Sequence, residues 1–143
     1  MSLRRRITCH TGSRLRVFVI MNAMLWAGQM LLAAVFLFSS VTKGTWSRTR
    51  LLAAGQTGVA RVPMWLLRVV AGAEFLGVLG LLLPGFVGVW PMATPLAALG
   101  LAMVMIGAMA IHLSQNEARV AAMNFGVFLL AVFVYVGRMG HLG

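Results

Sequence analysis

The chain has 143 residues, of which 61% are hydrophobic and only 10% are charged. An ordinary globular domain carries roughly 25% charged residues, and the mean hydropathy of +0.94 excludes such a domain here. Since each membrane crossing needs about 20 residues, the length allows four spans with short connections and no separate soluble domain.

The net charge of +10 arises from twelve Lys and Arg residues against only Glu74 and Glu117. The basic residues flank apolar segments, where anionic lipid headgroups and the positive-inside rule explain them. We therefore expect the partner of this charge to be the lipid bilayer and not nucleic acid. Cys9 is the only cysteine, which excludes an intrachain disulfide and self-contained thiol–disulfide exchange.

The first predicted element is a membrane span over residues 17–41, which contain no charged residue. Before it, residues 1–16 hold five arginines, and we expect them to form a basic, poorly ordered N-terminal extension. A secretory signal has a similar order, but this apolar run is too long and lacks a convincing cleavage site. The span would also be complete if translation began at Met21.

The connection after the first span, residues 42–62, is the longest and contains Leu51-Leu-Ala-Ala, which favours a short interfacial turn of helix. Loops of this kind often carry function. We expect it to be a lid or a docking loop, with an ordinary solvated loop as the alternative.

The second span is predicted over residues 63–83, because Pro63 suits the first position of a helix and Pro84-Gly85 ends the apolar run. The third span is predicted over residues 95–113, with Thr94 as its N-cap. The connection between them is short and uncharged. The two spans must therefore be antiparallel neighbours.

The fourth span is predicted over residues 120–137, because Ser114-Gln-Asn-Glu117 before it has the S-x-x-E form of a capping box. Residues 17–138 then form the membrane domain and residues 139–143 a short tail. Four spans place both termini on one side of the membrane, here called side A, opposite side B. The sequence thus predicts an all-α integral membrane protein, an antiparallel four-helix bundle.

Arg68 and Glu74 are the only charged residues between Val62 and Leu113, and charges at membrane depth are functional candidates. From the helical rise of about 1.5 Å per residue, Glu74 lies near the midplane and Arg68 closer to side B. Their spacing separates them around the helix, so each is expected to have a partner elsewhere. Arg68 can snorkel to side B, whereas a carboxylate as deep as Glu74 needs a proton or a partner.

Three further polar residues lie near the side B ends of their spans. Together with the two charges they would line one polar vestibule with Glu74 at its floor, and the candidate ligand-binding set is Glu74, Arg68, Lys43, His112 and Asn124. Each also has a structural interpretation. Lys43 would be an interface anchor, His112 an interfacial or hydrogen-bonding histidine, and Asn124 an interhelical hydrogen-bond donor.

Metal and haem sites are not favoured by the sequence. Met105, Met109 and His112 share one helix face, and soft ligands bind Cu(I), but methionines in an apolar chain serve mainly in packing. A bis-histidine haem is disfavoured because His10 and His141 lie outside the spans. We therefore predict no metal, assign no catalytic residue and no cofactor, and retain quinone as a candidate ligand.

The order of motifs along the chain carries a family resemblance. Thr42 and Lys43 close the first span, and the second reads Ala-Gly-Ala-Glu74-Phe-Leu-Gly77-Val-Leu-Gly80-Leu-Leu-Leu-Pro84. The third begins Thr94-Pro95-Leu-Ala-Ala-Leu-Gly100, and His112 and Asn124 follow. From about Met21 to Arg138 the chain resembles the DoxX-like family of small four-helix membrane proteins, although residues 1–20 depart from its pattern.

The resemblance implies a bundle in the bacterial inner membrane, with animal relatives, but it does not imply one activity. The family name is linked to a thiosulfate and quinone oxidoreductase. Other members look like partners of oxidative-stress enzymes, and animal relatives look like assembly factors for receptor channels.

Three functions therefore remain open. The first is a non-catalytic membrane subunit or assembly factor with a membrane or membrane-associated protein partner. The second is a quinone-binding subunit of a membrane oxidoreductase, in which His112 or Lys43 donates to a carbonyl and Glu74 relays a proton. The third is a small-solute or proton pathway. Small-xxx-small pairs such as Ala122 with Gly126 would also suit a homo-oligomer.

Overall fold

The structure, a computed structural model, describes the backbone of residues 3–140 and the side chains of residues 15–140. Its elements in chain order are α1 (Leu3–Thr45), α2 (Arg48–Ala53), the 3-10 helix η1 (Thr57–Ala60), α3 (Met64–Val87), α4 (Ala93–Ser114) and α5 (Ala118–Gly140). The described part contains no strand. The predicted all-α fold is confirmed.

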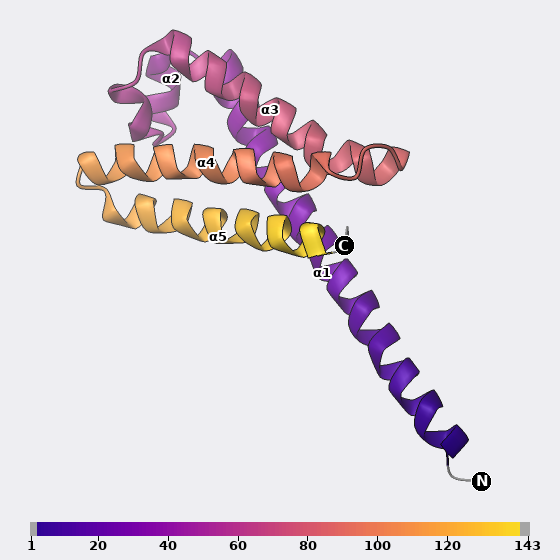
Figure 1. The fold of residues 1–143 in the computed structure, drawn as a ribbon. Coiled ribbons are helices and arrows are strands. Elements are labelled where there is room, and N and C mark those ends of the chain that lie inside the picture. Colours follow the sequence, from indigo (N-terminus) through magenta and orange to yellow (C-terminus); the bar gives the residue numbers. More distant parts are fainter. Residues whose placement is uncertain (1–2, 141–143) are drawn as a thin grey trace.

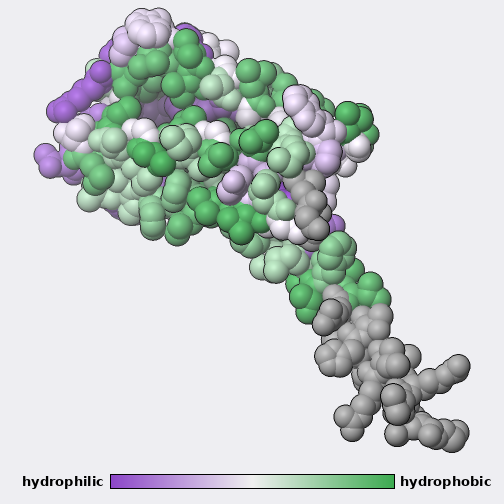
Figure 2. Space-filling model, in the orientation of Figure 1, coloured by the Kyte–Doolittle hydropathy of each residue, from purple (hydrophilic) through white to green (hydrophobic). Residues whose placement is uncertain are grey.

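Four helices form the bundle (Figure 1). Both α1 and α4 pack against α3 and α5, so the four helices make a closed ring in which chain neighbours run antiparallel. A core of buried residues such as Phe36, Leu81, Leu101 and Val134 fills the centre. Four helices, one of them the Leu15–Thr45 part of α1, are long and apolar enough to cross a bilayer. On the face drawn in Figure 2, their outer surface is largely hydrophobic, and hydrophilic residues gather near α2.

The N-terminal extension continues α1. The sequence predicts that residues 1–16 are poorly ordered; the described backbone of residues 3–16 is helical and projects beyond the bundle (Figure 1). The segment contains no proline and holds five arginines, and arginine is a good helix former. Extending an existing helix is easier than starting one, because each further residue that becomes ordered adds one hydrogen bond.

The end of α3 also differs from its prediction. Pro84 does not end the helix, which continues to Val87 and is closed by Gly88 in the left-handed conformation, φ 70°. Proline removes one backbone N–H and crowds the preceding turn. In that turn the Leu81 carbonyl accepts a 2.6 Å hydrogen bond from Nε2 of Gln29 on α1. The N–H that proline lacks would have bonded to the Gly80 carbonyl, so the bond from Gln29 is an additional link between α1 and α3 beside the proline and not a substitute for the lost bond.

Two predicted helix starts were wrong in detail. α4 begins at Ala93 with Met92 as the N-cap, so Thr94 lies inside the first turn and does not cap it. The Ser114–Glu117 capping box does not form, because Ser114 is the last residue of α4 and its hydroxyl donates to the Ile111 carbonyl. The Glu117 carboxylate makes tertiary contacts instead, which are described below.

The α1–α3 connection is folded onto the side B end of the bundle. Leu51 of α2 and Val59 of η1 are buried together with Leu67 of α3 in a small second core. Arg48 ties the two ends of the connection together by donating to the Ala60 and Val62 carbonyls at 3.0 and 2.7 Å. The predicted turn of helix at residues 51–54 is present as part of α2, and the whole segment forms a structured cap.

Candidate functional site

Lys43 and Glu74 form an ion pair between α1 and α3. Nζ of Lys43 lies 2.6 Å from Oε1 of Glu74, and the Glu74 side chain has no exposed surface, whereas that of Lys43 is 19% exposed. Glu74 lies ten residues after Met64, the first residue of α3, which is about 15 Å along the helix. The pair joins the end of α1 to the membrane-embedded middle of α3.

The second carboxylate oxygen of Glu74 has no hydrogen-bond partner. Oε2 is buried and unpaired, although Lys43 satisfies Oε1. An unsatisfied buried acceptor costs roughly 1–3 kcal/mol, and more when it is charged. This oxygen is therefore a position where a donor, such as a water molecule or a ligand hydroxyl, would be bound favourably.

Arg68 lies apart from Glu74 and serves the end of α1. Its guanidinium donates to the backbone carbonyls of Lys43 at 2.9 Å and Trp46 at 3.2 Å. The Lys43 carbonyl belongs to the last turn of α1 and Trp46 directly follows the helix, a region where acceptors lack helical partners and the helix dipole favours a cation. Arg68 is exposed and contacts Lys43 only at its backbone carbonyl. Its role is therefore to fix the end of α1, the segment that carries Lys43 of the ion pair.

His112, Glu117 and Thr57 form a second polar cluster. Oε2 of Glu117 lies 2.7 Å from Nδ1 of His112 and accepts a 2.7 Å hydrogen bond from the Thr57 hydroxyl. The hydrogen bond from Thr57, followed by that from His112, lowers the pKa of Glu117, which lies in the turn between α4 and α5. The cluster fastens η1 to this turn, and Arg61 adds a 3.0 Å bond to the Ser114 carbonyl.

The Glu117 contact orients the His112 ring. An ionised carboxylate only accepts hydrogen bonds, so Nδ1 of His112 must carry the proton in this contact. In the neutral ring Nε2 is then a free acceptor. Nε2 lies 3.1 Å from the position that a Cβ atom on Gly58 would take, which places it beside η1.

A cavity of about 380 Å³ lies between η1, α3 and α4. Its walls are mainly aliphatic, from residues such as Val59, Leu66, Val70 and Val104. Three polar side chains also line it, those of Lys43, Gln56 and His112. Small-molecule sites typically measure about 300–1,000 Å³ and combine apolar walls with a few placed polar groups, so this cavity has the size and the lining of a ligand site.

The structure brings together part of the predicted vestibule. Lys43 and His112 line the cavity, while Glu74 lies outside its lining and reaches it through Lys43. Asn124 is half-buried and does not line the cavity. Its side chain makes no hydrogen bond within the described part of the chain. The structure therefore has a cavity lined by Lys43 and His112 instead of a vestibule with Glu74 at its floor, and Glu74 lies behind Lys43 as its ion-pair partner.

Sequence reasoning missed the residues of the α1–α3 connection that close the cavity. Gln56 lines it and donates a 3.2 Å hydrogen bond to the Thr42 hydroxyl, and Thr57 holds Glu117. Neither residue belongs to a motif. The one signal in the sequence was the scarcity of acidic residues. Glu117 is one of only two in the chain, so a polar partner for it could have been sought in the α1–α3 connection.

The fold and its apolar exterior define a multi-pass integral membrane protein built on a compact four-helix bundle. The sequence model of the DoxX-like family matches residues 27–134, and the chain belongs to this family. No curated protein and no solved structure matches it.

Proposed function

We propose that this protein is a non-catalytic membrane subunit or accessory factor that holds a small apolar carbonyl compound, of the quinone class, in the cavity beneath η1. The observation that carries the proposal is the cavity of about 380 Å³ with Lys43 and His112 in its lining. Because the protein lies in the bilayer, a ligand dissolved in the membrane is consistent with its surroundings. Membership of the DoxX-like family is consistent with a role beside a redox system in the bacterial inner membrane.

The two polar ends of the cavity suit the two states of a quinone. Lys43 uses one ammonium proton for Glu74 and has others to donate to a quinone carbonyl. His112, oriented by Glu117, presents Nε2 as an acceptor for a hydroquinone hydroxyl.

A protein partner at side B is the second part of this proposal, since the α1–α3 connection is exposed and basic. Several of its cations are already engaged, however. Arg48 and Arg61 donate to backbone carbonyls, and Arg50 stacks on the Trp46 ring at 4.5 Å. The ligand cavity is therefore the better supported feature.

The test is a titration of the protein, purified in mild detergent, with a short-chain quinone, together with identification of co-purifying proteins. We expect stoichiometric binding that Lys43→Met and His112→Ala each weaken about tenfold, because each removes one hydrogen bond to the ligand. Arg50→Met, a loss of charge outside the cavity, is the matched control. If a stable protein partner co-purifies and no quinone binds, the ligand-binding part of the proposal is excluded and only the accessory role is left.

A further inference from the structure

A third polar cluster lies at the side A end of the bundle, opposite the cavity. Arg138 of α5 donates from Nε to Oε1 of Gln29 at 2.7 Å, again from Nη2 to the same oxygen, and from Nη1 to Oδ1 of Asn22 at 3.0 Å. Gln29 is only 1% exposed and is itself anchored to the Leu81 carbonyl. The guanidinium is thus held in one orientation by two amide groups of α1.

The charge of Arg138 is not matched by any acidic side chain. The chain has only two acids, and both are bonded elsewhere in the bundle, Glu74 to Lys43 and Glu117 to His112. Amide oxygens satisfy hydrogen bonds but bring no negative charge, and a partly buried cation is costly without a counterion. The three bonds use three of the five guanidinium N–H groups, which leaves two for an anion.

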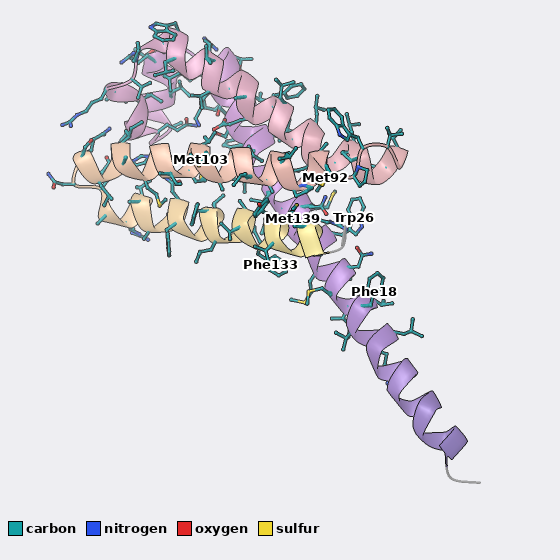
Figure 3. The ribbon with its side chains drawn as sticks, in the orientation of Figure 1. Phe18, Trp26, Met92, Met103, Phe133 and Met139 are labelled. Atoms are coloured by element: carbon teal, nitrogen blue, oxygen red, sulfur yellow. The ribbon has the colours of Figure 1, made fainter. Side chains whose placement is uncertain are left out.

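The surroundings of this cluster are those of a membrane interface. The Arg138 guanidinium lies 5.2 Å from the centroid of the Trp26 ring, and Trp26 contacts Phe86 at 5.5 Å between centroids. Phe86 and Trp90 are 70% and 73% exposed. Figure 3 shows Trp26 and Met139 together at the end of the bundle from which α1 projects. Aromatic side chains of this kind mark headgroup level, where lipid phosphates lie.

We propose that Arg138, oriented by Gln29 and Asn22, binds the phosphate group of an anionic membrane lipid at side A. A guanidinium fork with two free donors matches phosphate oxygens in geometry and charge. The Trp26 and Phe86 rings would lie beside the upper part of the lipid chains. This site is independent of the cavity, and either proposal can fail while the other holds.

The experiment is lipid binding to the full chain in detergent, measured by native mass spectrometry and by the shift in the thermal unfolding midpoint. The probes are phosphatidylglycerol, phosphatidylcholine and inorganic phosphate. We expect phosphatidylglycerol to bind best and Arg138→Gln to weaken it about tenfold, since a charge-assisted hydrogen-bond pair is lost. Arg138→Lys keeps the charge without the fork, so its loss should be smaller.

The matched control is Arg119→Gln, which removes one exposed arginine from the other end of the same helix and should leave phosphatidylglycerol binding unchanged. Equal loss in Arg119→Gln, or no loss in Arg138→Gln, would overturn the proposal. Equal stabilisation by inorganic phosphate would assign the site to a free anion and overturn the lipid assignment. Photo-crosslinking with a phosphatidylglycerol analogue tests the unmodified protein, where labelling should fall near Trp26 and Arg138, and labelling confined to residues 46–62 would contradict it.

Discussion

Lys43 connects the buried acid to the cavity, and the energetics of the site depend on this one side chain. Its ammonium group pairs with a carboxylate that has no exposed surface, while the same side chain lines the cavity. A buried ion pair gains little over a well-packed apolar pair, but removing one partner leaves the other uncompensated. The pair is therefore expected to tolerate joint replacement better than single replacement.

A double-mutant cycle at Lys43 and Glu74 tests this expectation. Lys43→Met leaves a fully buried carboxylate and should lower the free energy of unfolding by about 3 kcal/mol. Glu74→Leu should cost less, because the long, 19% exposed lysine can extend toward water. The double variant should recover much of the loss. Additive losses, measured by denaturation in detergent, would show that the two groups do not interact.

The Glu117 cluster makes a prediction about pH. Hydrogen bonds from Thr57 and His112 lower the pKa of Glu117. A carboxyl group with a lowered pKa in the folded state stabilises the fold fully above its unfolded pKa of about 4.3, and this stabilisation is lost as the pH falls through the folded value. Glu117→Gln should therefore have a lower thermal midpoint than the wild type at neutral pH.

The difference between the wild-type and Glu117→Gln midpoints should shrink as the solution is made acidic. The comparison cancels the effects of other titrating groups that both proteins share. A difference that stays constant from neutral pH to the acid side of the carboxyl range would mean that Glu117 does not stabilise η1 through its charge.

Residue identity alone predicted the important charges but not their partners. Glu74 and Arg68 were identified because charges in an apolar segment are rare, and their separation around α3 followed from helical geometry. The partner of Glu74 depends on how α1 lies against α3, which apolar patterns specify weakly. Glu117 was assigned to a capping box because local spacing matched, and a tertiary contact with Thr57 took its place.

At the scale of the elements, α3 and α4 approach closely where α3 carries glycines. A Cβ atom on Gly80 would lie 2.8 Å from Cβ of Ala97, and one on Gly77 would lie 2.6 Å from a Leu101 methyl group. Close approach through small residues is a common means of helix association in bilayers, where no hydrophobic force drives helices together. The α3–α4 contact also supports one side of the cavity.

Gly80→Ala should destabilise the bundle by about 1–3 kcal/mol, because the rigid Cβ of Ala97 cannot move without its backbone. Gly72→Ala is the matched control on the same helix, since an added Cβ there meets nothing within 4 Å. It should be neutral or slightly stabilising, given the better helix propensity of alanine. Equal midpoints for the two variants in thermal denaturation would contradict the close contact.

The helix count was predictable from the sequence, but the ends of several helices were not. Four apolar runs of sufficient length determine four spans. Pro84 was expected to end its helix, but the helix continues to Val87, and beside the proline Gln29 on α1 donates to the Leu81 carbonyl. This bond between helices is visible only when the two helices are placed together, and the local rule that proline ends a helix was insufficient here.

At the scale of the whole molecule, the bundle is asymmetric between its two membrane faces. The folded α1–α3 connection, the cavity and the Glu117–His112 pair lie at side B, and the Lys43–Glu74 pair lies deeper, toward the membrane midplane. Side A carries Arg138 among amides and aromatic rings. This arrangement separates a candidate ligand site at one face from a candidate lipid contact at the other, and both follow from the same four helices.

Filling the cavity beneath η1 is a direct test of the proposal that a quinone-class ligand binds there. Gly107 lines the cavity, and a Cβ added there meets nothing within 4 Å. Gly100 lies two turns earlier on α4, is equally open and does not line the cavity. Gly107→Leu and Gly100→Leu are therefore a matched pair.

The measurement is the dissociation constant of a short-chain quinone for these two variants and the wild type. We expect Gly107→Leu to weaken binding at least about tenfold, since the leucine would occupy part of the ligand volume, whereas Gly100→Leu should bind as the wild type does. Equal binding by both folded variants would mean that the ligand does not occupy this cavity.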